Sequence, residues 1–312
     1  MFRMSFIKSV STIVIFSLLV SCSSVPIKYL VDVPHELPVP TPVRNVEIAL
    51  VLGGGGARAI AQAGVIEILE KHHIPIDLIV GCSAGSIVGA LYADDPNYQH
   101  LHSKIININK WDVLDPSIMD TIAGLSQLRG PVRGLGLQRF LLNNLHSKRF
   151  EDLKIPLVAV TTDIRSNELF LISSGPIIPA VHASSAIPPV FSPVYIYNRI
   201  LIDGGVISPV PVEVARLYNP KLIIVVDISA PPAKDGLNNM FNLTYRSTEI
   251  FYYRLSRMEA KLADINIHPK LYGTGMFDDH EKAKLYEAGK VAALEHINLI
   301  KASMNRLKIN PR

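Results

Sequence analysis

A serine between a predicted strand and a predicted helix constrains this chain more than any other feature. The segment Gly81-Cys82-Ser83-Ala84-Gly85 follows residues 77–80, which predict a buried strand, and precedes residues 86–92, which have helical spacing. Because the turn is sharp, Ser83 projects its hydroxyl from the sheet, while Gly81 and Gly85 let strand and helix pass closely. A chance match to G-x-S-x-G is the alternative, but the flanking strand and helix favour a nucleophilic serine.

Strand patterns alternate with helical patterns along most of the chain. This alternation, with several strands apolar throughout, predicts a three-layer α/β/α sandwich with a mainly parallel central sheet. The expected strands are residues 46–52, 77–80, 157–162, 169–172, 199–202, 222–226 and 264–267. The expected helices are residues 57–72, 86–92, 137–145, 178–184, 240–262 and 279–306.

The first 22 residues have the pattern of an export signal. Arg3 and Lys8 make its start positive, and residues 9–20 are apolar but too short to span a bilayer core of ~30 Å. The segment ends in Leu19-Val20-Ser21-Cys22, which resembles the lipobox of bacterial lipoproteins, where cleavage precedes a lipidated cysteine. The alternatives are a signal peptide that merely contains a cysteine, or a short membrane anchor.

We therefore expect residues 1–21 to be cleaved and Cys22 to carry the lipid, in a bacterial cell envelope. The outer membrane is favoured over the inner one because Ser23 is not the aspartate that resembles a retention signal. Residues 22–44 are rich in proline and predict an extended tether. If Cys22 is lipidated, Cys82 has no partner for an intrachain disulfide, and we interpret it as a small buried side chain.

The folded part divides into residues 45–220, which carry the candidate site, and residues 221–306, a strand and helix region expected to pack on the same domain. Residues 94–150 form either a lid or acyl-pocket wall, or a plain connection. The net charge of +4 has no basic block, and no nucleic-acid-binding motif is present, so no nucleic-acid partner is expected. Metal-binding motifs are also missing, and no metal or cofactor is expected.

A glycine run, Gly53 to Gly56, follows the first predicted strand and precedes Ala57, Arg58 and a helix. Glycines here let the backbone approach a ligand and present its N–H groups. A phosphate-binding loop would need a Lys-Ser/Thr pair or an acid ending a second strand, and the chain has neither. Together with the serine turn, the run indicates an oxyanion hole.

The triplet Asp203-Gly204-Gly205 follows the predicted strand 199–202. An aspartate there lies at the sheet edge where α/β enzymes place catalytic groups, although an ordinary turn aspartate is the alternative. A conventional triad would add a histidine after the acid. The later histidines are His268, His280 and His296, and none lies on a suitable loop. We expect His280 and His296 within the last helix.

These elements, in this order and spacing, resemble the patatin-like phospholipase family from about Val46 to Asn219. The C-terminal helices are similar to those of its bacterial members. The matching elements are the glycine run, the serine turn, the segment Ala183 to Pro188 and the triplet at Asp203. One position departs from the family's G-x-G-x-x-G pattern, which closes with glycine where this chain has Ala59.

The resemblance implies a patatin-like fold and a Ser-Asp dyad, with Ser83 as nucleophile and Asp203 as general base and acid. It implies that Gly54, Gly55 and Gly56 donate to the oxyanion. The implied activity is a serine acyl hydrolase of phospholipase A, lysophospholipase or carboxylesterase type, acting on phospholipids or other fatty-acyl esters. The alternatives are an acyltransferase that uses the same acyl-enzyme, and a non-catalytic envelope scaffold.

Arg58 has two interpretations. It braces the glycine loop through an ion pair or carbonyl hydrogen bonds, or it binds the phosphate of a phospholipid, since arginine pairs bidentately with phosphate oxygens.

Overall fold

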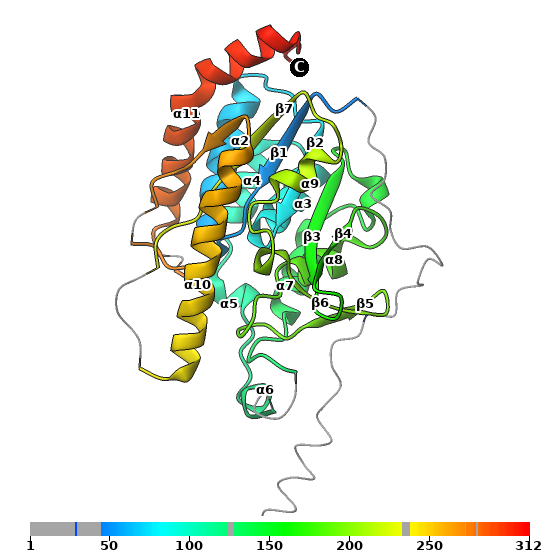
Figure 1. The fold of residues 1–312 in the computed structure, drawn as a ribbon, viewed down its shortest axis with the longest axis vertical. Coiled ribbons are helices and arrows are strands. Elements are labelled where there is room, and N and C mark those ends of the chain that lie inside the picture. The colour runs from blue at the N-terminus through cyan, green and yellow to red at the C-terminus, as the bar shows by residue number, and fades with distance from the viewer. Residues whose placement is uncertain (1–28, 30–44, 124–127, 233–237, 272, 279) are drawn as a thin grey trace, which may run out of the picture.

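The chain forms a helix-covered sheet (Figure 1), and the computed structural model describes residue 29 and residues 45–123, 128–232, 238–271, 273–278 and 280–312. The eight-stranded sheet has the order β5-β6-β3-β2-β1-β7-β8, and β4 pairs with β3 outside this path. The strands are β1 (Ile48–Leu52), β2 (Leu78–Cys82), β3 (Leu157–Asp163), β4 (Glu168–Ile172), β5 (Val194–Ile196), β6 (Arg199–Asp203), β7 (Leu222–Val226) and β8 (Ile265–Ile267).

The helices surround this sheet and also form a separate group between β2 and β3. The α-helices are α2 (Ile60–Lys71), α3 (Ala84–Asp94), α4 (Tyr98–Ile106), α5 (Lys110–Val113), α6 (Ile118–Ala123), α7 (Leu135–Asn144), α8 (Ile177–Ser184), α9 (Val212–Arg216), α10 (Met240–Glu259) and α11 (Lys282–Leu307). The 3-10 helices are η1 (Gly56–Ala59), η2 (Phe150–Asp152), η3 (Gly204–Val206) and η4 (Ala260–Leu262).

The sheet is parallel through its centre and antiparallel at one side. β3, β2, β1, β7 and β8 run parallel, whereas β4 and β6 run antiparallel to β3 and β5 runs antiparallel to β6. The predicted mainly parallel sheet is confirmed. β7 pairs with β1 in the middle of the sheet, so residues 221–306 contribute to the same sheet as the strands before them.

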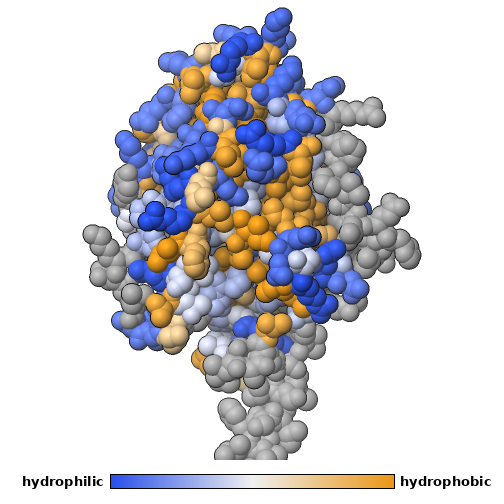
Figure 2. Space-filling view, viewed as in Figure 1, coloured by the Kyte–Doolittle hydropathy of each residue, from blue (hydrophilic) through white to orange (hydrophobic). Residues whose placement is uncertain are grey.

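Successive side chains of the central strands point to opposite faces of the sheet and pack into two hydrophobic cores, a larger one and a smaller one. On β1, Ile48, Leu50 and Leu52 face the larger core, which includes residues of α2, α3, α4, α7, α8 and α11. Ala49 and Val51 face the smaller core, which α9 and Ala260 of η4 cover. Figure 2 shows apolar surface over the middle of the face that α10 crosses.

Several element boundaries differ from those predicted. The helix expected over residues 57–72 begins as η1 and continues as α2, and the short strand β5 was not predicted. His280 was wrongly placed in the last helix, because α11 begins only at Lys282; His280 lies in the preceding turn. His296 is within α11 as expected, and its Nδ1 lies 2.8 Å from the Ala292 carbonyl oxygen.

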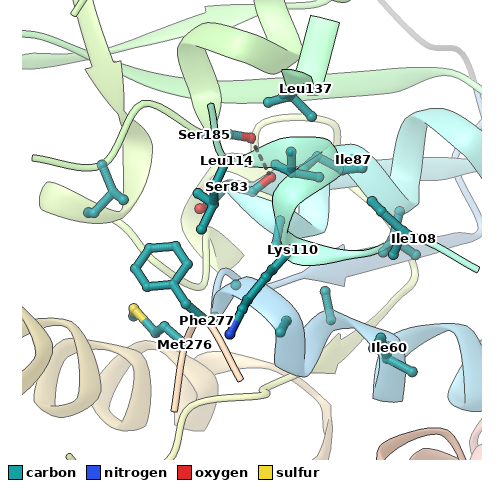
Figure 3. Close-up of a pocket in the computed structure, with 18 of the residues that line it drawn as sticks. Ile60, Ser83, Ile87, Ile108, Lys110, Leu114, Leu137, Ser185, Met276 and Phe277 are labelled. Carbon is teal, nitrogen blue, oxygen red and sulfur yellow. Dashed lines mark hydrogen bonds between the residues drawn. The ribbon is translucent and has the colours of Figure 1, made fainter. Parts of the chain in front are cut away.

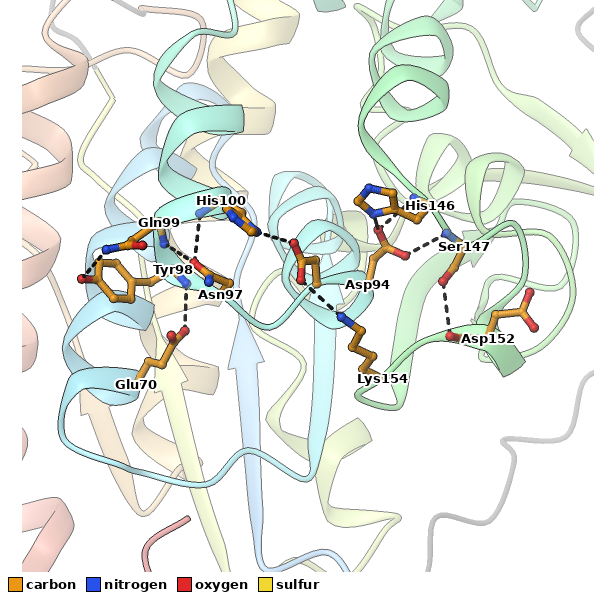
Figure 4. A network of polar contacts seen from close by, with 11 residues as sticks. Glu70, Asp94, Asn97, Tyr98, Gln99, His100, His146, Ser147, Asp152 and Lys154 are labelled. Carbon is orange, nitrogen blue, oxygen red and sulfur yellow. Dashed lines mark hydrogen bonds and ion pairs between the residues drawn. The ribbon is translucent and has the colours of Figure 1, made fainter.

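Polar contacts at the end of α3 hold both ends of residues 94–150 (Figure 4). Asp94 accepts from the N–H groups of His146 and Ser147 at 2.9 and 2.8 Å. The neighbouring Asp95 contacts His100 Nδ1 at 2.6 Å and Lys154 Nζ at 3.3 Å. The two ends of the segment are therefore held at one place, beside the end of α3.

Candidate active site

Ser83 lies at a strained turn between β2 and α3. Its backbone has φ 54° and ψ −129°, in a region that a residue with a side chain rarely occupies. The flanking glycines are required by space: a Cβ on Gly85 would lie 2.1 Å from the Leu52 carbonyl oxygen, and one on Gly81 would lie 2.7 Å from Ser86 Cα. The geometry is that of a nucleophile elbow, as the sequence predicted.

Two serines at the end of α8 hold this turn in place. Ser184 Oγ accepts from the Ser83 N–H at 3.0 Å and donates to the Val160 carbonyl at 2.7 Å. Ser185 Oγ donates to the Ser83 carbonyl at 3.2 Å (Figure 3). From the sequence alone this segment was no more than a helix end. Adjacent serines in an otherwise apolar helix were the available signal, since buried hydroxyls require partners.

Asp203 is completely buried at the end of β6. Its Oδ1 accepts from the Gly205 N–H at 2.7 Å and contacts Cys82 Sγ at 3.7 Å, whereas its Oδ2 is buried without a hydrogen-bond partner among the described residues. Burial raises the pKa of the Asp203 carboxyl to about 6, and the Ser83 hydroxyl is the first of the groups that oppose this shift. A carboxylate with a pKa near neutrality suits a general base.

The register of the sheet brings Asp203 to the level of Ser83. Cys82 of β2 pairs with Val160 of β3, and the next residue of β3, Thr161, pairs with Asp203 of β6. Because β6 is antiparallel to β3, the end of β6 lies at this level only through their short overlap. The position of Asp203 at this edge of the sheet therefore depends on an antiparallel strand pair.

Of the three predicted oxyanion donors, one is engaged elsewhere. The Gly54 N–H donates to the Pro209 carbonyl at 3.0 Å, so Gly54 does not serve as an oxyanion donor in this geometry. The N–H groups of Gly55 and Gly56 donate to no other described residue, and both glycines line the cavity at Ser83. The predicted oxyanion hole is thus reduced to Gly55 and Gly56, and it stays a prediction.

Arg58 is buried behind the glycine loop. Its Nε donates to the Gly55 carbonyl at 3.0 Å and its Nη1 to the Ala230 carbonyl at 3.5 Å. Burial lowers the pKa of the guanidinium from its ordinary value, and Arg58 is not among the residues that line the cavity. This geometry favours the bracing interpretation over phosphate binding.

Cys82, His182 and His268 are weaker candidates than Ser83 and Asp203 for the nucleophile and the base. Burial raises the pKa of the Cys82 thiol well above its ordinary value, which keeps it protonated. Burial lowers the pKa of His182 to about 4, and its Nδ1 lies 2.9 Å from the Tyr29 hydroxyl. His268 Nδ1 lies 2.7 Å from the Asp227 carbonyl. Among the residues the structure describes, no group of three His, Cys, Asp or Glu side chains is placed to hold a metal.

A cavity of about 140 Å³ opens above Ser83 and Asp203 (Figure 3). The rest of its lining is mostly apolar and comes from η1, α2, α3, α4, α5, α7, the segment between α8 and β5, and the loop before α11. The apolar side chains are Ile60, Ile87, Val88, Ile105, Ile108, Val113, Leu114, Leu137, Ile187, Phe191, Met276 and Phe277. Such a site suits an aliphatic chain whose ester group lies against a few polar atoms.

The cavity also contains a residue that the sequence did not reveal. Tyr252 reaches it from α10, and nothing in that helix distinguishes this tyrosine from its neighbours Tyr245 and Tyr253.

The expected lipidation site, Cys22, and residues 1–21 lie outside the described residues. Within the tether, Tyr29 donates its N–H to the Tyr195 carbonyl of β5 at 3.0 Å. Within the described part of the chain, none of the helices combines the length and apolar character needed to cross a membrane.

Comparison with known proteins identifies the family. Residues 50–216 match the model of the family described as patatin-like phospholipase. The chain is 34% identical over 196 residues to patatin-like phospholipase domain-containing protein 7 of Rattus norvegicus, covering 61% of this chain and 14% of that protein. It is 31% identical over 230 residues to an uncharacterized NTE family protein of Mycobacterium tuberculosis, covering 69% of this chain and 62% of that protein.

Among solved structures, VipD from Legionella pneumophila matches with a TM-score of 0.53 and 15% identity, over 82% of this chain and 67% of that chain. At this identity the match bears on the fold alone. The chain spans about a seventh of the length of the rat relative, 14% of it.

Proposed function

Because the chain belongs to the patatin-like phospholipase family, we propose that it hydrolyses fatty-acyl esters of lipids, with Ser83 as nucleophile and Asp203 as general base. One observation carries the proposal. A strained serine turn and a buried carboxylate with one unused oxygen meet at the base of an apolar cavity. An ester of a fatty acid places its chain in such a cavity and its carbonyl at the serine.

The first half of the reaction forms an acyl-enzyme. Ser83 Oγ attacks the ester carbonyl carbon while its proton passes to Asp203 Oδ2, the oxygen without a partner. The resulting oxyanion lies against the N–H groups of Gly55 and Gly56, and each such donor contributes about 10²–10³-fold in rate in other enzymes. Collapse breaks the bond to the alcohol, which leaves with the proton from Asp203.

The second half releases the fatty acid. Water attacks the acyl carbon, gives its proton to Asp203 and displaces Ser83 Oγ, which recovers the proton. An alcohol in place of this water would give acyl transfer by the same steps. No described feature favours a particular acceptor over water.

A fluorophosphonate probe tests the nucleophile, because labelling requires an activated serine. The purified protein should be labelled, and incubation with mixed phospholipids, lysophospholipids and neutral esters should release free fatty acid, detected by mass spectrometry. Absence of both labelling and release would support the scaffold alternative. Appearance of new acyl esters in place of fatty acid would support the transferase.

We propose further that Cys22 is lipidated and holds the protein at the bacterial envelope, at the outer membrane. Tyr29 gives this proposal a spatial consequence. Seven residues of chain reach at most about 25 Å, so contact of Tyr29 with β5 keeps the β5 side of the domain near the lipid. Cys22→Ala should leave the protein uncleaved or unlipidated and alter its membrane fractionation without loss of esterase activity. An unmodified Cys22 in the mature protein would overturn the proposal.

A further inference from the structure

Tyr252 reaches the active site from a helix that lies far from it in the sequence. The residue lies in the second half of α10 and is 3% exposed. Glu259, later on the same helix, accepts from Ser208 Oγ at 2.6 Å and from the Val210 N–H at 2.9 Å. Since both partners lie shortly after Asp203, these contacts hold α10 against the loop that carries the catalytic carboxylate.

Two glycines make room for this tyrosine beside the nucleophile. A Cβ on Gly54 would lie 1.5 Å from the Tyr252 hydroxyl oxygen and 2.9 Å from Ser83 Cβ. Because both distances start from the same point, the Tyr252 hydroxyl oxygen and Ser83 Cβ lie close together, no farther apart than the sum of the two distances. A Cβ on Gly205 would lie 2.1 Å from the Tyr252 ring. The glycines thus have a second role, since they admit a phenol next to Ser83.

The Tyr252 hydroxyl is buried and forms no hydrogen bond of good geometry with the described residues. The Cys82 thiol and the Ser83 hydroxyl are the polar side chains that affect its pKa as hydrogen-bonding groups. A buried tyrosine hydroxyl ordinarily has a hydrogen-bond partner. Asp203 Oδ2 is likewise without a partner, and both residues line the cavity together with Ser83. The Ser83 hydroxyl, which the proposed reaction uses, therefore has a donor beside it in the Tyr252 phenol and an acceptor in Asp203 Oδ2.

We propose that Tyr252 is a third catalytic residue, whose phenol donates a hydrogen bond to Ser83 Oγ as the serine transfers its proton to Asp203. The inference rests on the proposed function. With the proton passing directly to a carboxylate, negative charge accumulates on Oγ before the bond to carbon is complete. A preorganised donor at Oγ stabilises that charge. In the second half-reaction Oγ is the leaving atom, and the same hydrogen bond stabilises it again.

Tyr252 keeps its own proton throughout. Burial first, and then the neighbouring Cys82 and Asp203, raise the pKa of the phenol well above its ordinary value of 10. The phenol therefore stays protonated in the pH range where Asp203 titrates, and Asp203 alone accepts the serine proton.

The test compares Tyr252→Phe with Tyr253→Phe, the adjacent tyrosine on α10 that is not part of the cavity lining. Phenylalanine keeps the ring against Gly205 and removes only the hydroxyl. We expect the rate of fluorophosphonate labelling and kcat on a p-nitrophenyl ester to fall about 10- to 100-fold in Tyr252→Phe, with KM and Tm close to wild type. Tyr253→Phe should match wild type. Replacement of Tyr252 by 3-fluorotyrosine, a stronger donor of similar shape, should restore the rate.

Unchanged labelling in a folded Tyr252→Phe would overturn the proposal. If the phenol instead bonded to Asp203, its removal would raise the pKa of that carboxylate and move the acid limb of kcat/KM to higher pH, which would overturn the assignment to Oγ. A wild-type protein that is labelled but releases no fatty acid from lipids would contradict the proposed lipid substrate and leave the role of Tyr252 standing. A wild-type protein that is not labelled would contradict both.

Discussion

The two walls of the active-site cavity are built in different ways. The wall on the sheet consists of strand ends and tight turns, in which Ser83 and Asp203 are buried and the Ser83 backbone is held by Ser184 and Ser185. The opposite wall comes from the short helices between β2 and β3, pinned at both ends (Figure 4). On the outer surface of these helices, outside the cavity lining, Trp111 of α5 is 64% exposed and Ile118 of α6 is 80% exposed.

This difference suits the sheet wall to the chemical steps and the helical wall to contact with the substrate. Reacting atoms require placement within fractions of an ångström, which rigid strand ends provide. Exposed apolar side chains on the helical wall instead suit contact with a lipid surface or an acyl chain. Changes in the sheet wall should therefore alter the reaction on every ester, whereas changes in the helical wall should alter the choice of substrate.

The largest effect is expected for Ser83→Ala. Loss of the nucleophile should reduce esterase activity by roughly 10⁴–10⁶-fold and abolish fluorophosphonate labelling, with the fold intact. Activity on a soluble p-nitrophenyl ester and on phospholipid vesicles should disappear together. Substantial residual turnover would show that another group, such as Cys82, attacks the ester.

Asp203→Asn should reduce activity by about 10³–10⁴-fold, because the amide does not accept the serine proton. In the wild type, the base works only when ionised, so kcat/KM should rise with pH and reach half its maximum near the Asp203 pKa of about 6. The pH profile of the soluble ester checks this limb. A histidine variant such as His182→Gln that lost activity while Asp203→Asn kept it would favour a conventional triad.

Arg58→Gln tests whether the glycine loop, like the rest of the sheet wall, affects the hydrolysis of every ester alike. Since Arg58 bonds to the Gly55 carbonyl, its loss should displace the oxyanion donors and slow a phospholipid and an uncharged p-nitrophenyl ester alike, by about 10-fold. The comparison is the ratio of kcat/KM for the two substrates in variant and wild type. A loss confined to the phospholipid would restore the phosphate-binding interpretation.

The smallest effect is expected for Trp111→Ala on the helical wall. Removal of this exposed ring should lower activity on phospholipid vesicles by about threefold through weaker adsorption, because aromatic rings favour membrane interfaces. Activity on a soluble short-chain ester should not change. Equal losses on both substrates would contradict the proposal that the sheet wall carries the chemistry and the helical wall contacts the lipid.

The sequence by itself determined the parts of the site whose chemistry is local. Gly81 and Gly85 are needed where a strand and helix pass as closely as they do at a nucleophile elbow, so the turn at Ser83 was predictable from five residues. The continuous apolar runs predicted buried strands for the same reason, since their burial depends on composition more than on partners. The family assignment confirms the prediction made from these motifs and their order.

Only the tertiary structure decided how distant segments meet. Asp203 reaches Ser83 through an antiparallel register, Gly54 loses its N–H to Pro209, and the serines of α8 brace the elbow across β3. Tyr252 belongs to the same class, because its place depends on how α10 packs and not on any neighbour in the chain. Registers and helix packing are set by the sum of many weak contacts over the whole core, and a local pattern does not contain that sum.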